Sequence, residues 1–333
     1  MTVQYLPEIK SMRKHQTKLK IAIASLCAAC AFSAHAQTFP DRPITLVVPY
    51  AAGGITDAYA RSIGDYLGRL WDTQVVVENK GGAATIIGTQ QVARAKPDGY
   101  TLLLTSYAYT SNPILRKDLP YEPAALTPVM LLGNSRSMLV VPGKSDLHTL
   151  DDVIKKGKKA PGNLKFASSG NASSPHVAAE LWAKQVGVSF THVPYKGTGP
   201  AMNDLLAGLV DGIFDGPSSI TNVRAGRLRA LGIANESRHP AAPEVPTFKE
   251  QGIDMVFGSW FGFMAPANTP KPVIDKLNKG LNTSLKDPKV RKVLDNAGLF
   301  VVGGTPAEFA GFLDAEARKL QGLVDGGVKF IVQ

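Results

Sequence analysis

Cysteine is almost absent from this chain of 333 residues. Its two cysteines, Cys27 and Cys30, both lie within the first 36 residues, and no cysteine follows them. The part of the chain after residue 36 therefore cannot form a disulfide, a thiolate nucleophile or a cysteine-ligated metal site. Classes of enzyme that depend on any of these features are excluded.

Familiar catalytic and metal-binding motifs are also missing. The histidines after residue 36 show neither HExxH nor His-x-His spacing, so we expect no metal site. The chain has no Gly-x-Ser-x-Gly elbow of a hydrolase and no Gly-x-Gly-x-x-Gly turn of a dinucleotide-binding unit. We therefore expect no catalytic residue and no cofactor, and we interpret His176 and His192 as ordinary surface or helix residues.

Strong charge is lacking as well. The formal net charge is +10, and removing the five basic residues and one acidic residue of the first 36 leaves 32 basic and 26 acidic residues, or +6. This surplus is scattered, without basic runs beside aromatic residues, so no nucleic-acid partner is expected. A second long apolar run is also absent, so we do not expect the rest of the chain to span a membrane.

Residues 1–36 have the three parts of an export signal. Five basic residues precede the apolar run 21–32, and Ala34-His35-Ala36 is a small-x-small cleavage site. We expect cleavage after Ala36 and export of the mature protein from the cytoplasm; the family resemblance described below implies the periplasm as its location. Two alternatives stay open: lipid attachment at Cys30 of a lipoprotein, and a start of translation at Met12.

A turn of small residues at 50–57 connects a β-rich run at 44–48 to a helical pattern. Such a turn directs free backbone N–H groups and the positive end of a helix dipole toward one point, which favours an anion. No Lys-Ser or Lys-Thr follows the glycines, so a carboxylate fits better than a phosphate. Either Thr56 or Asp57 is a good N-cap for the helix. The alternative is a tight strand-to-helix turn without a ligand.

The first half of the chain alternates strands and helices, which predicts an α/β fold with a parallel sheet. The expected strands are 44–48, 74–78 and 100–105. The loops that follow them are 50–57, 81–85 and 106–112. These loops meet at the carboxyl edge of the sheet, where open α/β sheets bind ligands. A second alternating series begins at residue 164, and proline-capped helices after residue 269 support the first domain.

Seven segments, in the right order, match a known family. They read FPDRPI, VPYAAGGITD, VENK, PDGYTLL, VPYKG, AGRLRAL and WFGFMAPA. On these residues the chain resembles the Bug family, the periplasmic solute-binding receptors of tripartite tricarboxylate transporters, over nearly all of its length after residue 36. The resemblance implies a two-lobed periplasmic-binding-protein fold, a Venus flytrap of type II-like form. Each lobe would be a mostly parallel sheet flanked by helices.

The resemblance also implies how the lobes divide the chain and the site. Domain 1 would comprise 37–140 plus 258–333 and would pin a ligand carboxylate between its first two turns, partly through water. Domain 2, 141–257, would meet the far end of the ligand. The matching positions in domain 1 are Tyr50, Ala51, Gly53, Gly54, Thr56, Asp57, Ala83, Ala84 and Thr85, to which we add Thr105 and Ser106. In domain 2 they are Ser168, Asn171, Ala172, Ser173, Tyr195, Thr198, Gly199 and Asp215.

The second turn departs from the family pattern. Thr85 replaces the second of two paired glycines and Ile86 replaces a polar residue, which makes this rim less polar. Tyr107 and Tyr109 in the third loop favour an aromatic or less polar carboxylate over a citrate-like polyacid. The alternative is that both tyrosines pack under the loop.

Our main hypothesis is a periplasmic receptor, expected to be a monomer, whose lobes close by hinge motion on a small organic carboxylate. Its partner would be the permease of a tripartite tricarboxylate transporter. Asp57 would serve as N-cap and orient the loop or a water, since a bare carboxylate beside the ligand would repel it. Two alternatives are a ligand-sensing module that signals through a membrane partner, and a secreted hydrolase that depends on Ser168 or Ser169.

Overall fold

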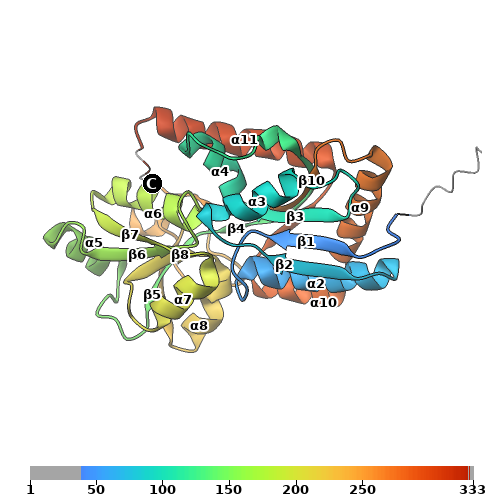
Figure 1. Cartoon of the computed structure of the whole chain (residues 1–333). Coiled ribbons are helices and arrows are strands. Elements are labelled where there is room, and N and C mark those ends of the chain that lie inside the picture. The colour runs from blue at the N-terminus through green and yellow to red at the C-terminus, as the bar shows by residue number, and fades with distance from the viewer. Residues whose placement is uncertain (1–38, 329, 331–333) are drawn as a thin grey trace, which may run out of the picture. The chain divides into compact units, whose positions relative to one another are not determined.

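The computed structural model of the chain describes residues 39–328 and 330 (Figure 1). The expected export signal, its cleavage site and Cys30 lie outside these residues. Among the described residues, none of the helices combines the length and the apolar character needed to cross a bilayer.

The first sheet contains the three parallel strands expected from the sequence. Within the described residues its order is β11-β4-β10-β3-β1-β2. The parallel strands are β1 (Ile44–Val48), β2 (Val75–Asn79) and β3 (Thr101–Ser106). The antiparallel strands are β4 (Leu126–Arg136), β10 (Gly258–Pro266) and β11 (Phe300–Gly303). Leucine and valine side chains of β1 and β3 are fully buried, as expected for strands covered on both faces.

The second sheet has the order β7-β6-β8-β5-β9 within the same part of the chain. Its strands are β5 (Met138–Pro142), β6 (Leu164–Ser168), β7 (Phe190–Pro194), β8 (Gly212–Asp215) and β9 (Leu228–Ile233). β6 pairs in parallel with β7 and β8, whereas β5 pairs antiparallel with β8 and β9. The α/β class is therefore confirmed, but both sheets are mixed. The antiparallel pairs arise because strands next to the lobe crossings run against the parallel ones.

The chain crosses between the sheets at two neighbouring points. Ser137 separates β4 from β5, and Phe257 immediately precedes β10. The Ser137 N–H donates to the Phe257 carbonyl at 2.9 Å, so the two crossings are hydrogen-bonded to each other. The first crossing comes earlier than the expected boundary at residue 140, because Met138 and Val140 already pair within the second sheet. Two adjacent crossings of this kind are typical of a hinge between two lobes, and we refer to this place as the hinge.

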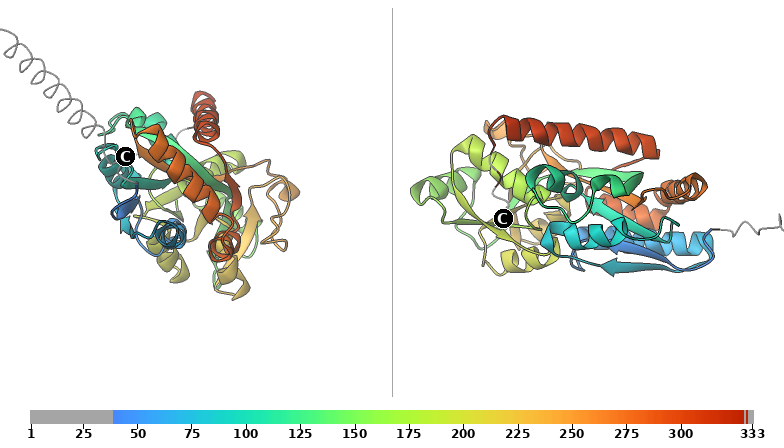
Figure 2. Two further views of the ribbon diagram at one scale, coloured as in Figure 1. Left: turned by 90° about the vertical axis from the view of Figure 1, so that its right-hand side faces the viewer. Right: turned by 45° about the horizontal axis from the view of Figure 1, so that its top comes forward.

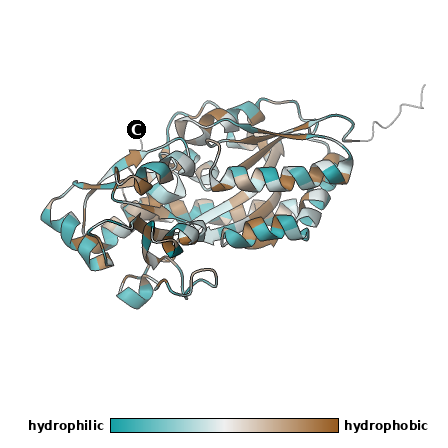
Figure 3. Cartoon of the chain, turned by 90° about the horizontal axis from the view of Figure 1, so that it is seen from below, coloured by the Kyte–Doolittle hydropathy of each residue, from teal (hydrophilic) through white to brown (hydrophobic). Residues whose placement is uncertain are grey.

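Helices cover both sheets. Those of the first lobe are α2 (Ile55–Trp71), α3 (Ile86–Ala93), α4 (Ala108–Leu115), α9 (Lys271–Ser284), α10 (Pro288–Asn296) and α11 (Pro306–Asp325). Those of the second lobe are α5 (Leu150–Lys159), α6 (Ser174–Val186), α7 (Thr198–Leu206) and α8 (Ile220–Arg224). Figure 2 shows the red helix α11 along one side of the first sheet, where it packs against β4 and α4. In Figure 3 the strands are largely brown, and the helices carry alternating teal and brown stripes.

Helix caps follow the sequence signals at several positions. Thr149 and Thr305 each form a capping box, with Asp152 and Glu308 respectively, at the starts of α5 and α11. Asp287 caps α10, accepting from the N–H groups of the second and third residues after it. These interactions satisfy backbone donors that the first turn of a helix leaves unpaired.

The third expected loop, 106–112, is mostly the helix α4 and not a loop. Tyr107 and Tyr109 are 2% and 8% exposed, and both belong to an apolar cluster with Trp260 and Phe309. The interpretation that they pack beneath this segment is confirmed, and they do not line the cavity described below. The argument from these tyrosines for an aromatic ligand is therefore wrong.

Candidate functional site

A cavity lies where the two lobes meet. Many of the residues around it lie at or just after the carboxyl ends of β1, β3, β6 and β8, the position at which α/β sheets bind ligands. The volume that the centres of water molecules can occupy is about 50 Å³, and the surrounding empty space, which includes open solvent, is about 640 Å³. A single enclosed water needs roughly 10–15 Å³ of the smaller kind of volume. The cavity therefore suits a small molecule.

Three helices begin at the wall of this cavity. Ile55 opens α2 from the first lobe, whereas Ser174 and Thr198 open α6 and α7 from the second, and all three residues line the cavity. The first turn of each helix has N–H groups without partners inside the helix, and its dipole is positive at that end. Their convergence from both lobes favours a negatively charged group between them.

Neutral hydroxyl groups add hydrogen-bonding capacity. The hydroxyl oxygens of Tyr50 and Ser106 are 2.5 Å apart, and both residues line the cavity. Burial raises the pKa of Tyr50 to about 12, although the Ser106 hydrogen bond opposes the shift. Burial, followed by the charge of Asp215, likewise raises the pKa of Tyr59. Both phenols therefore stay neutral at ordinary pH and can donate to an anion.

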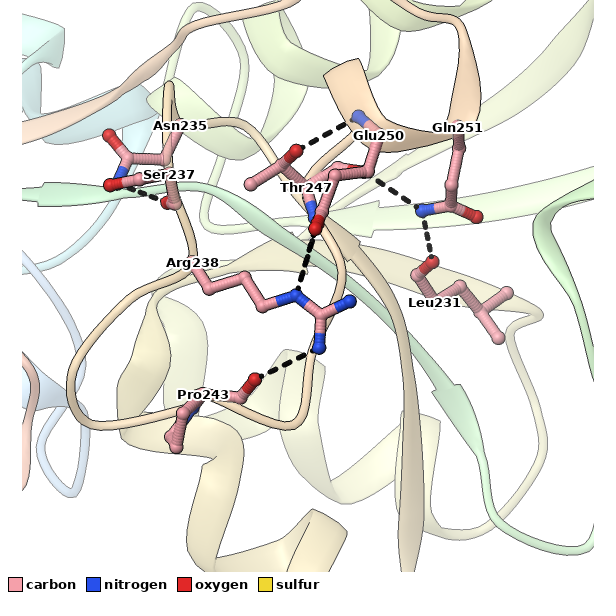
Figure 4. A network of polar contacts seen from close by, with 8 residues as sticks. All are labelled: Leu231, Asn235, Ser237, Arg238, Pro243, Thr247, Glu250 and Gln251. Carbon is pink, nitrogen blue, oxygen red and sulfur yellow. Dashed lines mark hydrogen bonds and ion pairs between the residues drawn. The ribbon is translucent and has the colours of Figure 1, made fainter.

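Arg136 is the one cationic side chain among the described residues that line the cavity, and the sequence analysis missed it. Its Nε donates to Asn235 Oδ1 at 3.0 Å, and its Nη1 donates to Asn134 Oδ1 at 3.3 Å. The Asn235 amide is itself oriented by the Ser237 carbonyl, which lies in the network shown in Figure 4. Arg136 therefore stands at the hinge, held by neutral amides from both lobes.

Asp57 is not the N-cap of α2. Gly54 holds that position, so Thr56 is not the N-cap either. Asp57 is the third residue of the helix, within its first turn, and its Oδ2 accepts from the Gly53 N–H at 3.1 Å. Arg61 also donates to this carboxylate and forms an ion pair with it at 2.9 Å. Burial acts to raise the pKa of Asp57, but the Arg61 and Gly53 interactions outweigh it and lower the pKa. Asp57 orients the turn, and it does not line the cavity.

The second turn of the first lobe has an unusual backbone. Ala83, Ala84 and Thr85 have φ angles of 44°, 54° and 77°, which is costly for residues with a Cβ. Asn112 of α4 donates to the Ala84 carbonyl at 2.8 Å and to Thr85 Oγ1 at 3.3 Å. The turn does not line the cavity. It lies against the second lobe instead, where a Cβ on Gly170 would be 3.4 Å from Ala84 Cα.

Replacing Asn112 by alanine is expected to lower the free energy of unfolding by about 2 kcal/mol. Asn112 is fully buried, so its removal leaves the Ala84 carbonyl and other buried groups without a partner. Denaturant unfolding measures the change, with Asn296→Ala on the exposed end of α10 as the control. Equal stability of the two variants would mean that Asn112 does not hold the turn.

The two lobes touch directly beside the cavity. The Ala51 N–H donates to the Lys196 carbonyl at 2.8 Å, and Ser111 Oγ donates to the Ala172 carbonyl at 2.5 Å. A Cβ on Gly199 would be 3.3 Å from the Ala52 carbonyl oxygen, so any side chain at this position would press against the first lobe. Gly199 and its neighbours therefore control how closely the lobes meet.

The structure brings some of the expected residues to the cavity wall and leaves others outside it. Those that line the cavity are Tyr50, Gly54, Thr56, Ser106, Thr198 and Asp215. Those that do not are Ala51, Gly53, Asp57, Ala83, Ala84, Thr85, Thr105, Ser168, Asn171, Ala172, Ser173, Tyr195 and Gly199. The second group shapes the turns and the contact between lobes, or is buried within strands. Tyr195, for example, donates to Asp204 Oδ2 at 2.6 Å.

Several residues that line the cavity were not among the predicted site residues. They include Tyr59, Ser135, Arg136, Ser137, Ser169, Ser174, Ser218, Ser259 and Phe261. The available signal was the segment Asn134-Ser135-Arg136-Ser137, a basic residue among small polar ones between two strands. Only the crossing of the chain at Ser137 shows why this segment faces the cavity.

His176 is a helix residue, in α6, but it does not lie at the surface, and His192 is a partly buried residue of β7. His176 is fully buried, and the two rings stack with centroids 3.8 Å apart and planes 2° from parallel. Burial, followed by the neighbouring His176, lowers the pKa of His192 to about 3, so its ring is neutral. His192 Nε2 is 2.6 Å from Ser168 Oγ, and His176 Nδ1 accepts from the Ala172 N–H. The pair supports the loop between β6 and α6.

This serine–histidine pair is not arranged as a hydrolase site. Ser168 is fully buried, is hydrogen-bonded to Gly170, and does not line the cavity. Ser169 does line it, but the histidine contact belongs to Ser168. Within the described residues, no group of three or more His, Cys, Asp or Glu side chains could hold a metal ion.

Comparison with known proteins agrees with this architecture. The profile of the family described as "Tripartite tricarboxylate transporter family receptor" matches residues 59–326. BugT of Bordetella pertussis is 35% identical over 320 residues, which cover 93% of this chain and 97% of BugT. The structure of the periplasmic binding protein BugD is 35% identical with a TM-score of 0.83, covering 87% of this chain and 99% of BugD.

Two further structures contain bound acids. MatC from Rhodopseudomonas palustris, with bound malate, is 31% identical with a TM-score of 0.82, covering 86% of this chain and 100% of MatC. R. palustris Rpa4515 with adipate is 30% identical with a TM-score of 0.82, covering 86% of this chain and 97% of that one. The family profile matches most of the chain, and these relatives are at least 30% identical to it over most of their length; together they establish which family the chain belongs to. The chain belongs to the receptors of tripartite tricarboxylate transporters, the Bug family of periplasmic solute-binding proteins.

Proposed function

We propose that this receptor captures a small organic carboxylate in the cavity between its lobes and delivers it to a tripartite tricarboxylate-type membrane transporter. The observation that carries the proposal is the convergence of Arg136 with the starts of α2, α6 and α7 on one cavity. A guanidinium and helix N-termini compensate the lost hydration of a carboxylate with short, charge-assisted hydrogen bonds. Tyr50, Gly54, Thr56, Ser106, Thr198 and Asp215 would contact the ligand.

The acids bound by two related structures support the same class of ligand. MatC holds malate and Rpa4515 holds adipate, and both share this fold at about one third identity. A second cavity in this chain, about 520 Å³, has a wall of mixed polar and apolar character that includes Leu181, Phe257 and Trp260. It shares Arg136 and Ser259 with the first, but its wall also contains the carboxylates Asp254 and Glu316, which would repel an anion. The first cavity is therefore the better site for an anion.

The proposed location follows from the expected export signal at 1–36 with cleavage after Ala36. A receptor of this family works in the periplasm, where it meets solutes before the membrane transporter does. We further infer that the chain binds its ligand without chemical conversion. Ser169 and Ser174 line the cavity as hydroxyl donors, and neither has a hydrogen bond to a histidine within the described residues.

A thermal-shift screen of monocarboxylates, dicarboxylates, tricarboxylates and aromatic acids tests the proposal. A ligand that binds only the folded protein stabilises it by about 2.7 kcal/mol at 100 times its Kd, which corresponds to roughly 5 °C here. We expect at least one small acid to raise the melting temperature in proportion to the logarithm of its concentration. The amides of the same acids serve as controls. A response to the amides equal to that of the acids would contradict carboxylate recognition.

A further inference from the structure

Asp215 is an acid in a cavity otherwise built for an anion. It ends β8, is 8% exposed, and is the one carboxylate among the residues that line the cavity. Ser219 Oγ donates to its Oδ2 at 2.6 Å and Ser218 Oγ at 3.4 Å, and the Gly216 backbone adds a third hydrogen bond. All three donors are neutral. Within the described residues Asp215 has no ion pair.

Burial without a counter-ion leaves the charged form of Asp215 poorly compensated. Burial raises the pKa of Asp215, and the hydrogen bonds from Ser219, Gly216 and Ser218 only reduce that effect. Its negative charge reaches across the cavity to the first lobe, because it contributes to the raised pKa of Tyr59. A cationic group of a ligand, placed beside Asp215, would supply the counter-ion that Asp215 lacks within the described residues.

The wall of the cavity also contains a positive charge, that of Arg136, without an acidic side chain paired to it within the described residues. Arg136 is bound by the amide oxygens of Asn134 and Asn235, and no acid of the described chain forms an ion pair with it. Glu316 acts on Arg136 only from a distance and is itself ion-paired with Lys319 at 2.6 Å. The wall therefore presents one cation and one anion, each open to a ligand of complementary charge.

We propose that Asp215 determines specificity by selecting ligands that carry a protonated amine as well as a carboxylate. The amine would pair with Asp215 on the second lobe, while the carboxylate would meet Arg136 and the helix N-termini. A second carboxylate at the same place would be repelled by Asp215. This inference rests on the proposed function, since it assumes that the cavity binds an acid. It names the ligand as an amino acid in preference to a plain dicarboxylate of the same length.

Matched pairs of acids test the inference on the unmodified protein. Succinate with aspartate, and glutarate with glutamate, differ only by the amine. Calorimetric titration is expected to show at least tenfold tighter binding of the amino acid in one of the pairs. If none of the four binds, the comparison moves to the acid identified by the thermal-shift screen and its α-amino counterpart. Binding of the plain acid as tight as or tighter than its amino counterpart would overturn the inference while leaving carboxylate capture intact.

The Asp215→Asn variant assigns the preference to this residue. We expect the amino acid to bind at least tenfold more weakly, and the plain dicarboxylate, no longer repelled by a carboxylate, to bind more tightly. Asp275→Asn on α9, where the ion pair with Lys271 is exposed, is the matched control. A ratio of the two affinities unchanged by Asp215→Asn would show that another group reads the amine. Failure of every acid to bind the wild-type protein would instead refute the proposed function itself.

Discussion

Replacing Arg136 by glutamine should weaken binding of the carboxylate ligand about 100-fold. The guanidinium lines the cavity and has donors beyond those used by Asn134 and Asn235. Removing one partner of a desolvated, hydrogen-bonded charge pair costs about 2–5 kcal/mol, and about 2.7 kcal/mol corresponds to a factor of 100. Calorimetric titration of the acid found in the screen measures the loss.

Two further variants separate the charge from other effects. Arg136→Lys keeps the positive charge but lacks the planar fork of donors, so we expect an intermediate loss of affinity. Arg291→Gln on α10 removes an exposed arginine that pairs with Asp295, and should leave binding unchanged. Melting temperatures without ligand report any loss of folding at the hinge. Wild-type affinity in Arg136→Gln would exclude this residue from the site.

Replacing Gly199 by valine should weaken ligand binding at least 30-fold with little change in the stability of the unliganded chain. Gly199 lies in the first turn of α7, and a Cβ there would already be 3.3 Å from the Ala52 carbonyl oxygen of the other lobe. The same Cβ would be 3.4 Å from the Gly53 carbonyl carbon, and the two additional methyl groups of valine add bulk at this already tight contact. The substitution therefore disfavours the closed arrangement, and affinity falls with the population of that arrangement.

Gly311→Val is the matched control for this prediction. Gly311 is also helical, in α11, and an added Cβ would meet no atom within 4 Å. Calorimetry and thermal unfolding of both variants separate closure from folding. We expect the control to bind as the wild type does. Equal affinities of Gly199→Val and Gly311→Val would mean that binding does not require the lobes to approach through Gly199.

The elements of this fold that depend on short stretches of sequence could be predicted from the sequence. β-branched runs predicted β1 and β2, and an apolar run of leucines predicted β3. Proline and threonine signals predicted the starts of α10 and α11, because all these signals act over a few residues. The antiparallel strands β4 and β10 were harder to place. Their direction depends on where the chain crosses between the lobes, which no local pattern encodes.

The residues of the site also divide into those that local patterns predict and those that only tertiary contacts place. Tyr50, Gly54 and Thr56 were expected at the cavity because a strand-to-helix turn directs its backbone toward the carboxyl edge of a sheet. Arg136 was missed because it reaches the cavity through the hinge crossing and its contact with Asn235, which is 99 residues away. The turn 83–85 was expected at the ligand, but its left-handed backbone and its contact with Asn112 place it against the other lobe.

Burial of the two histidines also needed tertiary information. His176 and His192 come from a helix and a strand that are neighbours only in the folded second lobe, where their rings stack. A lone histidine in a sequence carries no indication of such a partner. The same stack lies beside Ser168, whose hydroxyl is buried and hydrogen-bonded within the loop that follows β6.

Hydrogen exchange with and without the acid that gives the largest thermal shift tests the location of the site most directly. Bound ligand should slow exchange of backbone amides in the cavity wall, in the turn 50–57, at the start of α7 and in 215–219. Segments 254–260 and 312–323, which line the second cavity, should change less. Protection concentrated in those two segments, or no protection in 50–57, would contradict capture of a carboxylate between the lobes.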